Sequence, residues 1–235
     1  MKVHPVQMLS ALLLLASLLC PAQAPSSKNA AAVVLQAFET HDIVKLGEIH
    51  WNKQEYEWLQ SLIANPEFAD RVDDVVMEFG NSLYQKSVDR HVAGEAFPIE
   101  EVQRAWRNTL GLGDPPPIYG DLYTTVRETN MRRHSKHQMR VLCGDPYINW
   151  DKVRTKDDIG PFLGHRDQWY AHVVEDEVLG KHYRAFLIAG SAHFLREHGE
   201  GYGEGYIEPE LRRAGAKTFL ILAGTNAVKG YDDQS

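Results

Sequence analysis

The chain has 235 residues, of which 43% are hydrophobic and 24% are charged, and this ordinary globular composition excludes a disordered or fibrous protein. Its length suits one large domain. The 25 basic and 32 acidic residues give a net charge of −7, which argues against a nucleic-acid-binding protein because such a protein needs a basic face.

Residues 1–24 have the pattern of a secretory signal peptide. Lys2 gives a positive start, residues 8–19 form an apolar stretch too short to span a bilayer, and residues 22–24 read Ala-Gln-Ala. Leu19 before Cys20 does not fit a lipoprotein signal, so we expect an exported protein, periplasmic or secreted, without a lipid anchor. No later apolar stretch is long enough to span a membrane, so we expect none in the mature chain.

Five short apolar runs predict the strands of a sheet. Each has four to six residues rich in Val, Ile, Leu and Phe, which is typical of strands that are covered on both faces. Amphipathic helical patterns separate the runs, and this alternation predicts crossover connections and a parallel sheet. The predicted strands are residues 43–46, 74–79, 139–142, 184–189 and 217–222, and the predicted helices are residues 54–63, 100–110, 167–179 and 208–214.

The sequence therefore predicts an α/β fold: a mostly parallel central sheet of about five strands, with helices on both faces and a helical insertion after the second strand. We expect one domain over residues 30–228, a helical cap at about residues 81–130 and a disordered tail at 229–235. Residues 199–206 read Gly-Glu-Gly-Tyr-Gly-Glu-Gly-Tyr and predict a flexible loop.

Polar side chains follow four of the predicted strands. Ligands of open parallel sheets bind outside the carboxyl ends of the strands, so these side chains are the candidates for a shared site. Apolar neighbours on both sides of Glu78 predict a buried carboxylate that needs a partner. The candidates are Glu48, His50, Glu78, Asp145 and His193.

Two chemistries are compatible with these side chains. In the first, His50 acts as a general base, Glu48 or Glu78 orients it, and His193 assists as an acid or by polarising a carbonyl. In the second, His50, His193 and Glu78 bind a divalent metal such as Mn²⁺, Co²⁺ or Zn²⁺ that generates hydroxide. The pattern of residues leaves both open. Residues 139–142 end just before Cys143, which predicts a buried cysteine and not a nucleophile.

Three segments resemble a known family. Leu46-Gly47-Glu48-Ile49-His50, Val76-Met77-Glu78-Phe79 and Ala189-Gly190-Ser191-Ala192-His193 are similar to the Gly-Glu-x-His turn, the strand-end Glu and the second Gly-x-x-His of the Tiki/ChaN/erythromycin-esterase superfamily, a haem-binding uptake and hydrolase group. The segment from Asp89 to Gly94, followed by a helix with Trp106, resembles the ChaN-like branch.

This resemblance implies a strand-end pocket built from Glu48, His50, Glu78 and His193. Members of the superfamily include esterases, metal-dependent proteases and exported haem-binding proteins. We therefore expect a hydrolase that acts on a small-molecule or peptide substrate with an ester or amide bond. The alternative is a haem- or iron-binding protein, in which Asp145, Tyr202 and Tyr206 contribute to cofactor binding and a tyrosine supplies an axial phenolate.

Overall fold

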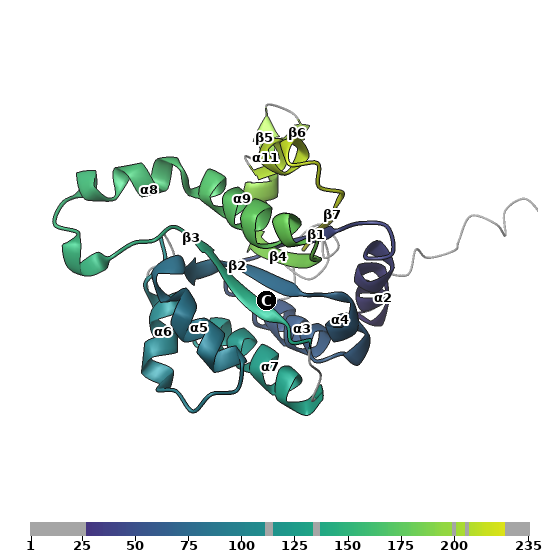
Figure 1. Cartoon of the computed structure of the whole chain (residues 1–235). Helices are drawn as coiled ribbons and strands as arrows, with labels where there is room; N and C mark the ends of the chain where they lie inside the picture. Colours follow the sequence, from purple (N-terminus) through teal and green to yellow (C-terminus); the bar gives the residue numbers. More distant parts are fainter. Residues whose placement is uncertain (1–26, 111–114, 134–136, 199–200, 205–206, 224–235) are drawn as a thin grey trace, which may run out of the picture.

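Five parallel strands form the central sheet in the computed structural model of the protein (Figure 1). The structure describes residues 27–110, 115–133, 137–198, 201–204 and 207–223. The order across the sheet is β3-β2-β4-β1-β7, and every neighbouring pair is parallel. The strands are β1 (Ile43–Glu48), β2 (Asp74–Asn81), β3 (Arg140–Asp145), β4 (Ala185–Gly190) and β7 (Thr218–Leu222). The predicted α/β class is confirmed, and each strand contains most of the run that predicted it.

Helices cover both faces of this sheet. Figure 1 shows one group below the sheet and α8, α9 and α11 above it. The first group is α2 (Ser27–Ala37), α3 (Lys53–Ile63), α4 (Pro66–Arg71), η2 (Ser82–Tyr84), α5 (Gln85–Val92), α6 (Ile99–Arg107) and α7 (Ile118–Arg133). The later helices are η3 (Trp150–Lys152), η4 (Lys156–Asp158), α8 (Gly160–Gly164), α9 (Arg166–Glu177), η5 (Leu179–Lys181), α10 (Ser191–Phe194) and α11 (Ile207–Arg213).

The apolar stripes read from the sequence become the two halves of the core. All four residues of the predicted stripe on α3 are buried: Tyr56, Leu59, Leu62 and Ile63. They join a core cluster below the sheet, and α9 packs Tyr170 and Val174 into a second cluster above it. The strands between these clusters are buried at every position in β1, β2 and β4, which explains their nearly continuous apolar runs.

The insertion after β2 lies on one face of the sheet. It contains η2, α5, α6 and α7; α7 packs against α3 and α5, and α6 packs against β2. Trp106 of α6 lies against Gly120 of α7, where a Cβ atom would be 2.4 Å from the indole. The predicted helical insertion is confirmed, and its helices extend the layer that α3 and α4 begin (Figure 1).

One segment differs from its prediction. The glycine-rich run was expected to be a loop, but Gly201–Glu204 forms strand β6 and pairs antiparallel with β5 (Leu195–His198). Backbone pairing with the preceding residues overrides the weak strand preference of glycine. The signal peptide at residues 1–24 and the tail at 229–235 lie outside the described residues.

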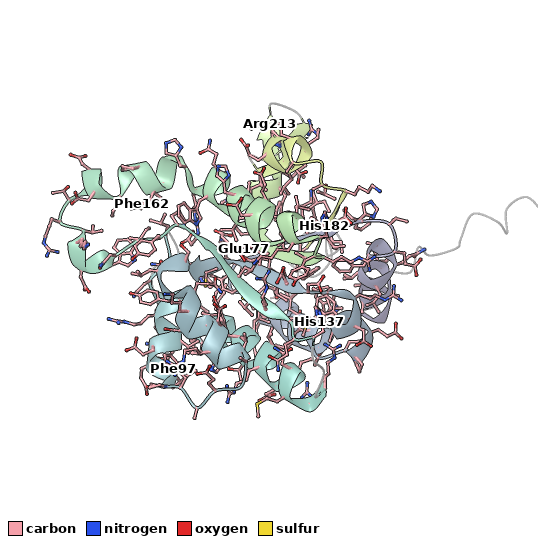
Figure 2. All side chains as sticks on the ribbon, viewed as in Figure 1. Phe97, His137, Phe162, Glu177, His182 and Arg213 are labelled. Carbon is pink, nitrogen blue, oxygen red and sulfur yellow. The ribbon has the colours of Figure 1, made fainter. Side chains whose placement is uncertain are left out.

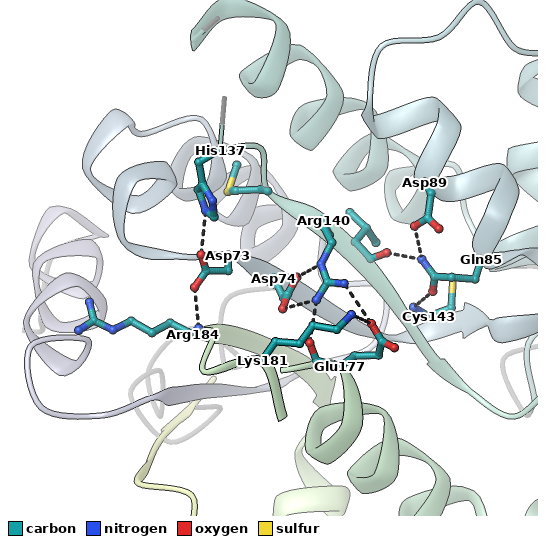
Figure 3. A network of polar contacts seen from close by, with 12 residues as sticks. Asp73, Asp74, Gln85, Asp89, His137, Arg140, Cys143, Glu177, Lys181 and Arg184 are labelled. Carbon is teal, nitrogen blue, oxygen red and sulfur yellow. Dashed lines mark hydrogen bonds and ion pairs between the residues drawn. The ribbon is translucent and has the colours of Figure 1, made fainter. Parts of the chain in front are cut away.

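The amino ends of the strands are tied together by ion pairs (Figure 3). Arg140 at the start of β3 donates to both carboxylate oxygens of Asp74 at the start of β2, at 2.6 and 2.9 Å, and to Glu177 of α9 at 3.0 Å. His137 contacts Asp73 at 2.8 Å, and Figure 2 labels His137 near the same edge. Arg140 is thus paired with carboxylates of β2 and α9, which favours a structural role for this cluster.

Within the part of the chain that the structure describes, no helix combines the length and the apolar character needed to cross a bilayer.

Candidate functional site

The connections of the central strands leave a crevice at their carboxyl ends. β4 lies between β1 and β2. The chain leaves β1 and β2 toward the helices below the sheet, and it leaves β4 toward α10 and α11 above it. Neighbouring strands whose connections go to opposite faces define the point where open α/β sheets bind ligands. The candidate residues lie at this point, because Glu48 is in register with Gly190 and Met77, next to Glu78, is in register with Ile188.

The first half of the site is a pair formed by Glu48 and His50. Glu48 is 2% exposed at the end of β1, and its Oε1 is hydrogen-bonded to Nδ1 of His50. This hydrogen bond raises the pKa of His50, although burial partly opposes it. The His50 side chain is 37% exposed, so its ring remains accessible while the carboxylate beneath it is buried. The arrangement holds Nδ1 and leaves Nε2 available.

The second half is built around Glu78 at the end of β2. Its Oε2 accepts a hydrogen bond from the Gly190 amide at 2.6 Å, and its Oε1 lies 3.1 Å from Nε2 of His193. Arg166 Nη2 lies 2.9 Å from the same Oε1 as an ion pair. Burial raises the pKa of Glu78, but the hydrogen bond and charge of His193 and the charge of Arg166 outweigh it and lower the pKa to about 2. Glu78 is therefore ionised.

His193 lies between two carboxylates. Its Nδ1 is hydrogen-bonded to Asp167 and its Nε2 contacts Glu78. Burial lowers the pKa of His193, but the hydrogen bonds to Asp167 and Glu78 outweigh this effect and raise the pKa to about 9. His193 is an imidazolium at neutral pH, and its charge acts on His50 in the opposite direction to that of Glu48.

Asp145, at the end of β3, supports the site through Arg166. It is 1% exposed, its Oδ1 accepts from Arg166 Nε at 2.5 Å, and its Oδ2 accepts from the Leu110 amide at 2.5 Å. Burial raises its pKa to about 6, with Arg166 acting in the opposite direction. Asp145 therefore holds Arg166 against Glu78. Both of its oxygens have protein partners, which makes it a positioning residue for Arg166, and its part in cofactor binding stays a prediction.

Gly190 makes room for the imidazole of His50. A Cβ atom at Gly190 would lie 2.9 Å from Cε1 and 3.1 Å from Nε2 of His50, and 3.5 Å from Oε2 of Glu78. The ring of His50 thus lies directly against the backbone of β4. This contact joins the two halves of the site, since Glu78 binds the amide of the same glycine.

Three side chains offer donor atoms for a metal ion. One oxygen each of Glu48 and Glu78 and one nitrogen of His50 all lie within 4.8 Å of one another. Glu48 Oε2 is buried without a hydrogen-bond partner among the described residues, which suits a cation. Two carboxylates and an imidazole are ligands that Zn²⁺, Mn²⁺ and Co²⁺ accept. His193, included in the predicted ligand set, has both ring nitrogens in contact with carboxylates, so Glu48 is the better third ligand.

Sequence reasoning missed Arg166 and Asp167. They begin α9, which follows β3, so the start of this helix lies at the carboxyl edge with the other polar groups. The start of the helix that follows the third predicted strand is therefore the position at which the sequence could have indicated Arg166 and Asp167. Of the two tyrosines proposed for cofactor binding, Tyr206 lies outside the described residues, and the side chain of Tyr202 on β6 does too.

Comparisons with known proteins leave the family open. No family model matches the chain. Among curated proteins it is similar to the terminal oxygenase component CarAa of carbazole 1,9a-dioxygenase from Metapseudomonas resinovorans, with 29% identity over 145 residues, 55% of this chain and 36% of that protein. The chain thus spans about a third of that relative's length. Among solved structures, a chain described as "Bacterial protein toxins" has a TM-score of 0.49 and 13% identity, covering 86% of this chain and 37% of that chain.

Proposed function

We propose that the protein is a hydrolase that cleaves an ester or amide bond at the crevice between β1, β4 and β2. The observation that carries this proposal is the buried Glu48 bound to Nδ1 of the half-exposed His50, beside the ionised Glu78 and the cationic His193. A carboxylate on one imidazole nitrogen fixes the tautomer and leaves the other nitrogen as a base.

The reaction follows from these positions. Nε2 of neutral His50 takes a proton from water as the water oxygen bonds to the carbonyl carbon of the substrate. Glu48 stabilises the imidazolium that forms. The bond to the leaving oxygen or nitrogen then breaks, and the leaving atom takes the proton back from His50. His193 and Arg166 place positive charge beside the crevice, where it stabilises the negative oxygen of the intermediate.

A divalent metal would be held by Glu48, His50 and Glu78, and when bound it would polarise the carbonyl and lower the pKa of water. In either case Glu78 keeps His193 and Arg166 in place through its ion pairs. Elemental analysis of the purified protein, followed by assays with Mn²⁺, Co²⁺, Zn²⁺ or a chelator, distinguishes a metal-assisted reaction from simple acid–base catalysis.

The proposal is tested with a panel of esters and amides. We expect His50→Ala to lose at least 100-fold in kcat/KM, because a positioned general base contributes about 10²–10⁴. Glu78→Gln should also lower kcat/KM, because it removes the charge that keeps His193 and Arg166 in place. His172→Ala is the matched control, since His172 is an exposed histidine on α9 and its side chain is 67% accessible. An inactive wild-type protein across the panel, with and without metals, would contradict the proposal.

We also propose membership of the Tiki/ChaN/erythromycin-esterase superfamily and export through residues 1–24. The meeting of Glu48, His50, Glu78 and His193 at one edge supports the first, since that is the pocket the resemblance implies. Sequencing the amino terminus of the protein recovered from the extracytoplasmic fraction tests the second. The haem-binding alternative stays a prediction: titration with haemin supports it if a new Soret band appears.

A further inference from the structure

Trp51, the residue after His50, has an unusual backbone and an unusual exposure. Its φ angle is +67°, in the left-handed region that a bulky residue rarely adopts. The indole is also 57% exposed. A tryptophan gains little from packing in such a position, and a glycine would fit the backbone better. Strained, exposed residues of this kind are found at functional sites.

A hydrogen-bonded turn holds Trp51 in this conformation. The Asn52 amide donates to the Ile49 carbonyl at 3.1 Å, so His50 and Trp51 are the two central residues of a four-residue turn. The Trp51 amide donates to Tyr119 Oη at 3.4 Å, and Asn52 caps α3 by accepting from the Glu55 amide. Because a positive φ at the third position usually selects glycine or asparagine, the tryptophan here is not explained by the turn.

The turn places the indole beside the proposed base. The ring centroids of His50 and Trp51 are 6.4 Å apart and their planes are tilted by 46°. Trp51 also lines a groove of about 340 Å³ together with Pro116, Pro117 and Ile118. Trp51 is thus a ring neighbour of the proposed base and also one of the residues that line the groove.

The chemistry of the groove indicates its ligand. Two proline rings, an isoleucine and an indole form the apolar part of the lining, which suits the face of a flat ring. The rest of the lining is polar: Lys53, Glu57, Gln60 and Asp121. Lys53 at the rim is paired with Glu57, with Nζ and Oε1 3.3 Å apart, so its charge is already balanced. Asp121 also lines the groove and makes a cationic group the competing ligand.

We infer that Trp51 is a specificity-determining residue that stacks on an uncharged aromatic ring attached to the scissile ester or amide. The attachment of the ring to a scissile bond rests on the proposed function, whereas the binding of the ring to Trp51 does not. Substrates with a benzoyl group should have a lower KM than matched acetyl substrates, because the ring adds stacking energy that the methyl group lacks.

The test is a binding measurement that needs no turnover. Acetophenone is a non-hydrolysable probe of the aromatic group, and cyclohexyl methyl ketone has a ring of similar size without a flat π face. In calorimetric titration we expect the wild type to bind acetophenone more tightly than cyclohexyl methyl ketone. Trp51→Gly should bind acetophenone approximately tenfold more weakly than the wild type does, which is the loss expected for one stacked ring. Stronger binding of tetramethylammonium than of acetophenone would overturn the inference in favour of a cationic ligand.

The glycine substitution also separates function from structure. Glycine tolerates a φ of +67°, so Trp51→Gly should keep or raise the midpoint of thermal unfolding while it lowers the affinity for acetophenone. His182→Gly is the matched control, because His182 has φ +56° before β4, at the opposite edge of the sheet. It should gain the same backbone relief and bind acetophenone like the wild type.

Three results would contradict the inference: equal acetophenone binding in the wild type and Trp51→Gly, a large loss of stability in Trp51→Gly, or a loss of binding in His182→Gly. If the ester panel shows no turnover while acetophenone binding still depends on Trp51, the proposed hydrolysis fails and the binding site stands. If turnover is seen but benzoyl and acetyl esters have equal KM values in both proteins, the proposed function stands and Trp51 is not its specificity residue.

Discussion

At the scale of single residues, three carboxylates at the strand ends are each at most 2% exposed: Glu48, Glu78 and Asp145. Burial raises the pKa of Glu78 and of Asp145. Burial is the largest single effect on both, but at Glu78 the combined effects of His193, Arg166 and the Gly190 amide outweigh it and lower the pKa to about 2, whereas at Asp145 the pKa is raised to about 6. The pKa of Glu78 and that of Asp145 therefore depend on the balance between burial and the cations beside each carboxylate.

The pair formed by Glu48 and His50 makes a prediction about pH dependence. His50 must be neutral to act as a base, and Glu48 raises its pKa, so kcat/KM should rise with pH through that raised value. Glu48→Gln removes the charge that favours the imidazolium, so the rise should move to lower pH while the plateau falls about 100-fold. A pH profile of kcat/KM checks both effects, and an unshifted rise would contradict the role of Glu48.

The pair formed by Glu78 and His193 makes a prediction about stability. Because the pKa of His193 is raised to about 9 from 6.5, its contribution is complete below pH 6.5 and is lost as pH rises through 9. His193→Ala leaves two carboxylates without this partner and should cost about 3–5 kcal/mol at pH 6. Urea denaturation at pH 6 and pH 10 should show this difference shrinking at pH 10.

The exposed His172 again provides the control. His172→Ala should leave the free energy of unfolding unchanged within about 0.5 kcal/mol at both pH values. A loss for His193→Ala that is independent of pH would mean that His193 stabilises the protein by packing and not by its charge.

At the scale of elements, α9 is the helix whose position decides the second half of the site. It carries Arg166 and Asp167 at its start, and it approaches β3 closely through Tyr170. A Cβ atom at Gly144 would lie 2.4 Å from the ring of Tyr170 and 2.9 Å from the carbonyl oxygen of Met77. Gly144 therefore sets the distance between this helix and the sheet.

Gly144→Ala should thus destabilise the protein by about 1–3 kcal/mol, the usual range for overpacking a core. It should also lower kcat/KM, because α9 would move Arg166 and Asp167 away from Glu78 and His193. Thermal denaturation and the ester assay check the two effects. Gly164→Ala is the control, since no atom lies within 4 Å of its added Cβ; equal behaviour of the two variants would contradict the close approach.

At the scale of the whole molecule, the sheet has its most protected strands in the middle. β4 and β1 are buried at every position and pair on both sides, whereas β7 forms an edge and is only partly buried. The two ends of the strands also have different roles. Ion pairs around Arg140 tie the amino ends together, and the candidate site lies at the carboxyl ends.

Hydrogen exchange should follow this order. Amides of β4 and β1 should exchange most slowly, near the rate of global unfolding, and amides of β7 should exchange faster because an edge strand opens locally. Mass spectrometry of peptides from each strand measures the order. Equal protection of β7 and β4 would contradict the expectation that the edge strand opens locally.

Local sequence determined much of this protein. Runs of branched apolar residues place the five strands, the stripe on α3 places four core residues, and the residue types after the strands identify Glu48, His50, Glu78 and His193. These features depend on the period of hydrophobic residues and on residue chemistry, which a single sequence contains.

Only the tertiary structure decided how these residues meet. The insertion of β4 between β1 and β2 brings Glu48 and Glu78 to either side of Gly190, and the start of α9 supplies Arg166 and Asp167. The positive φ of Trp51 and the pairing of Gly201–Glu204 were likewise hidden from the sequence. Strand order and ion pairs between residues about a hundred positions apart arise from long-range packing, which local patterns do not encode.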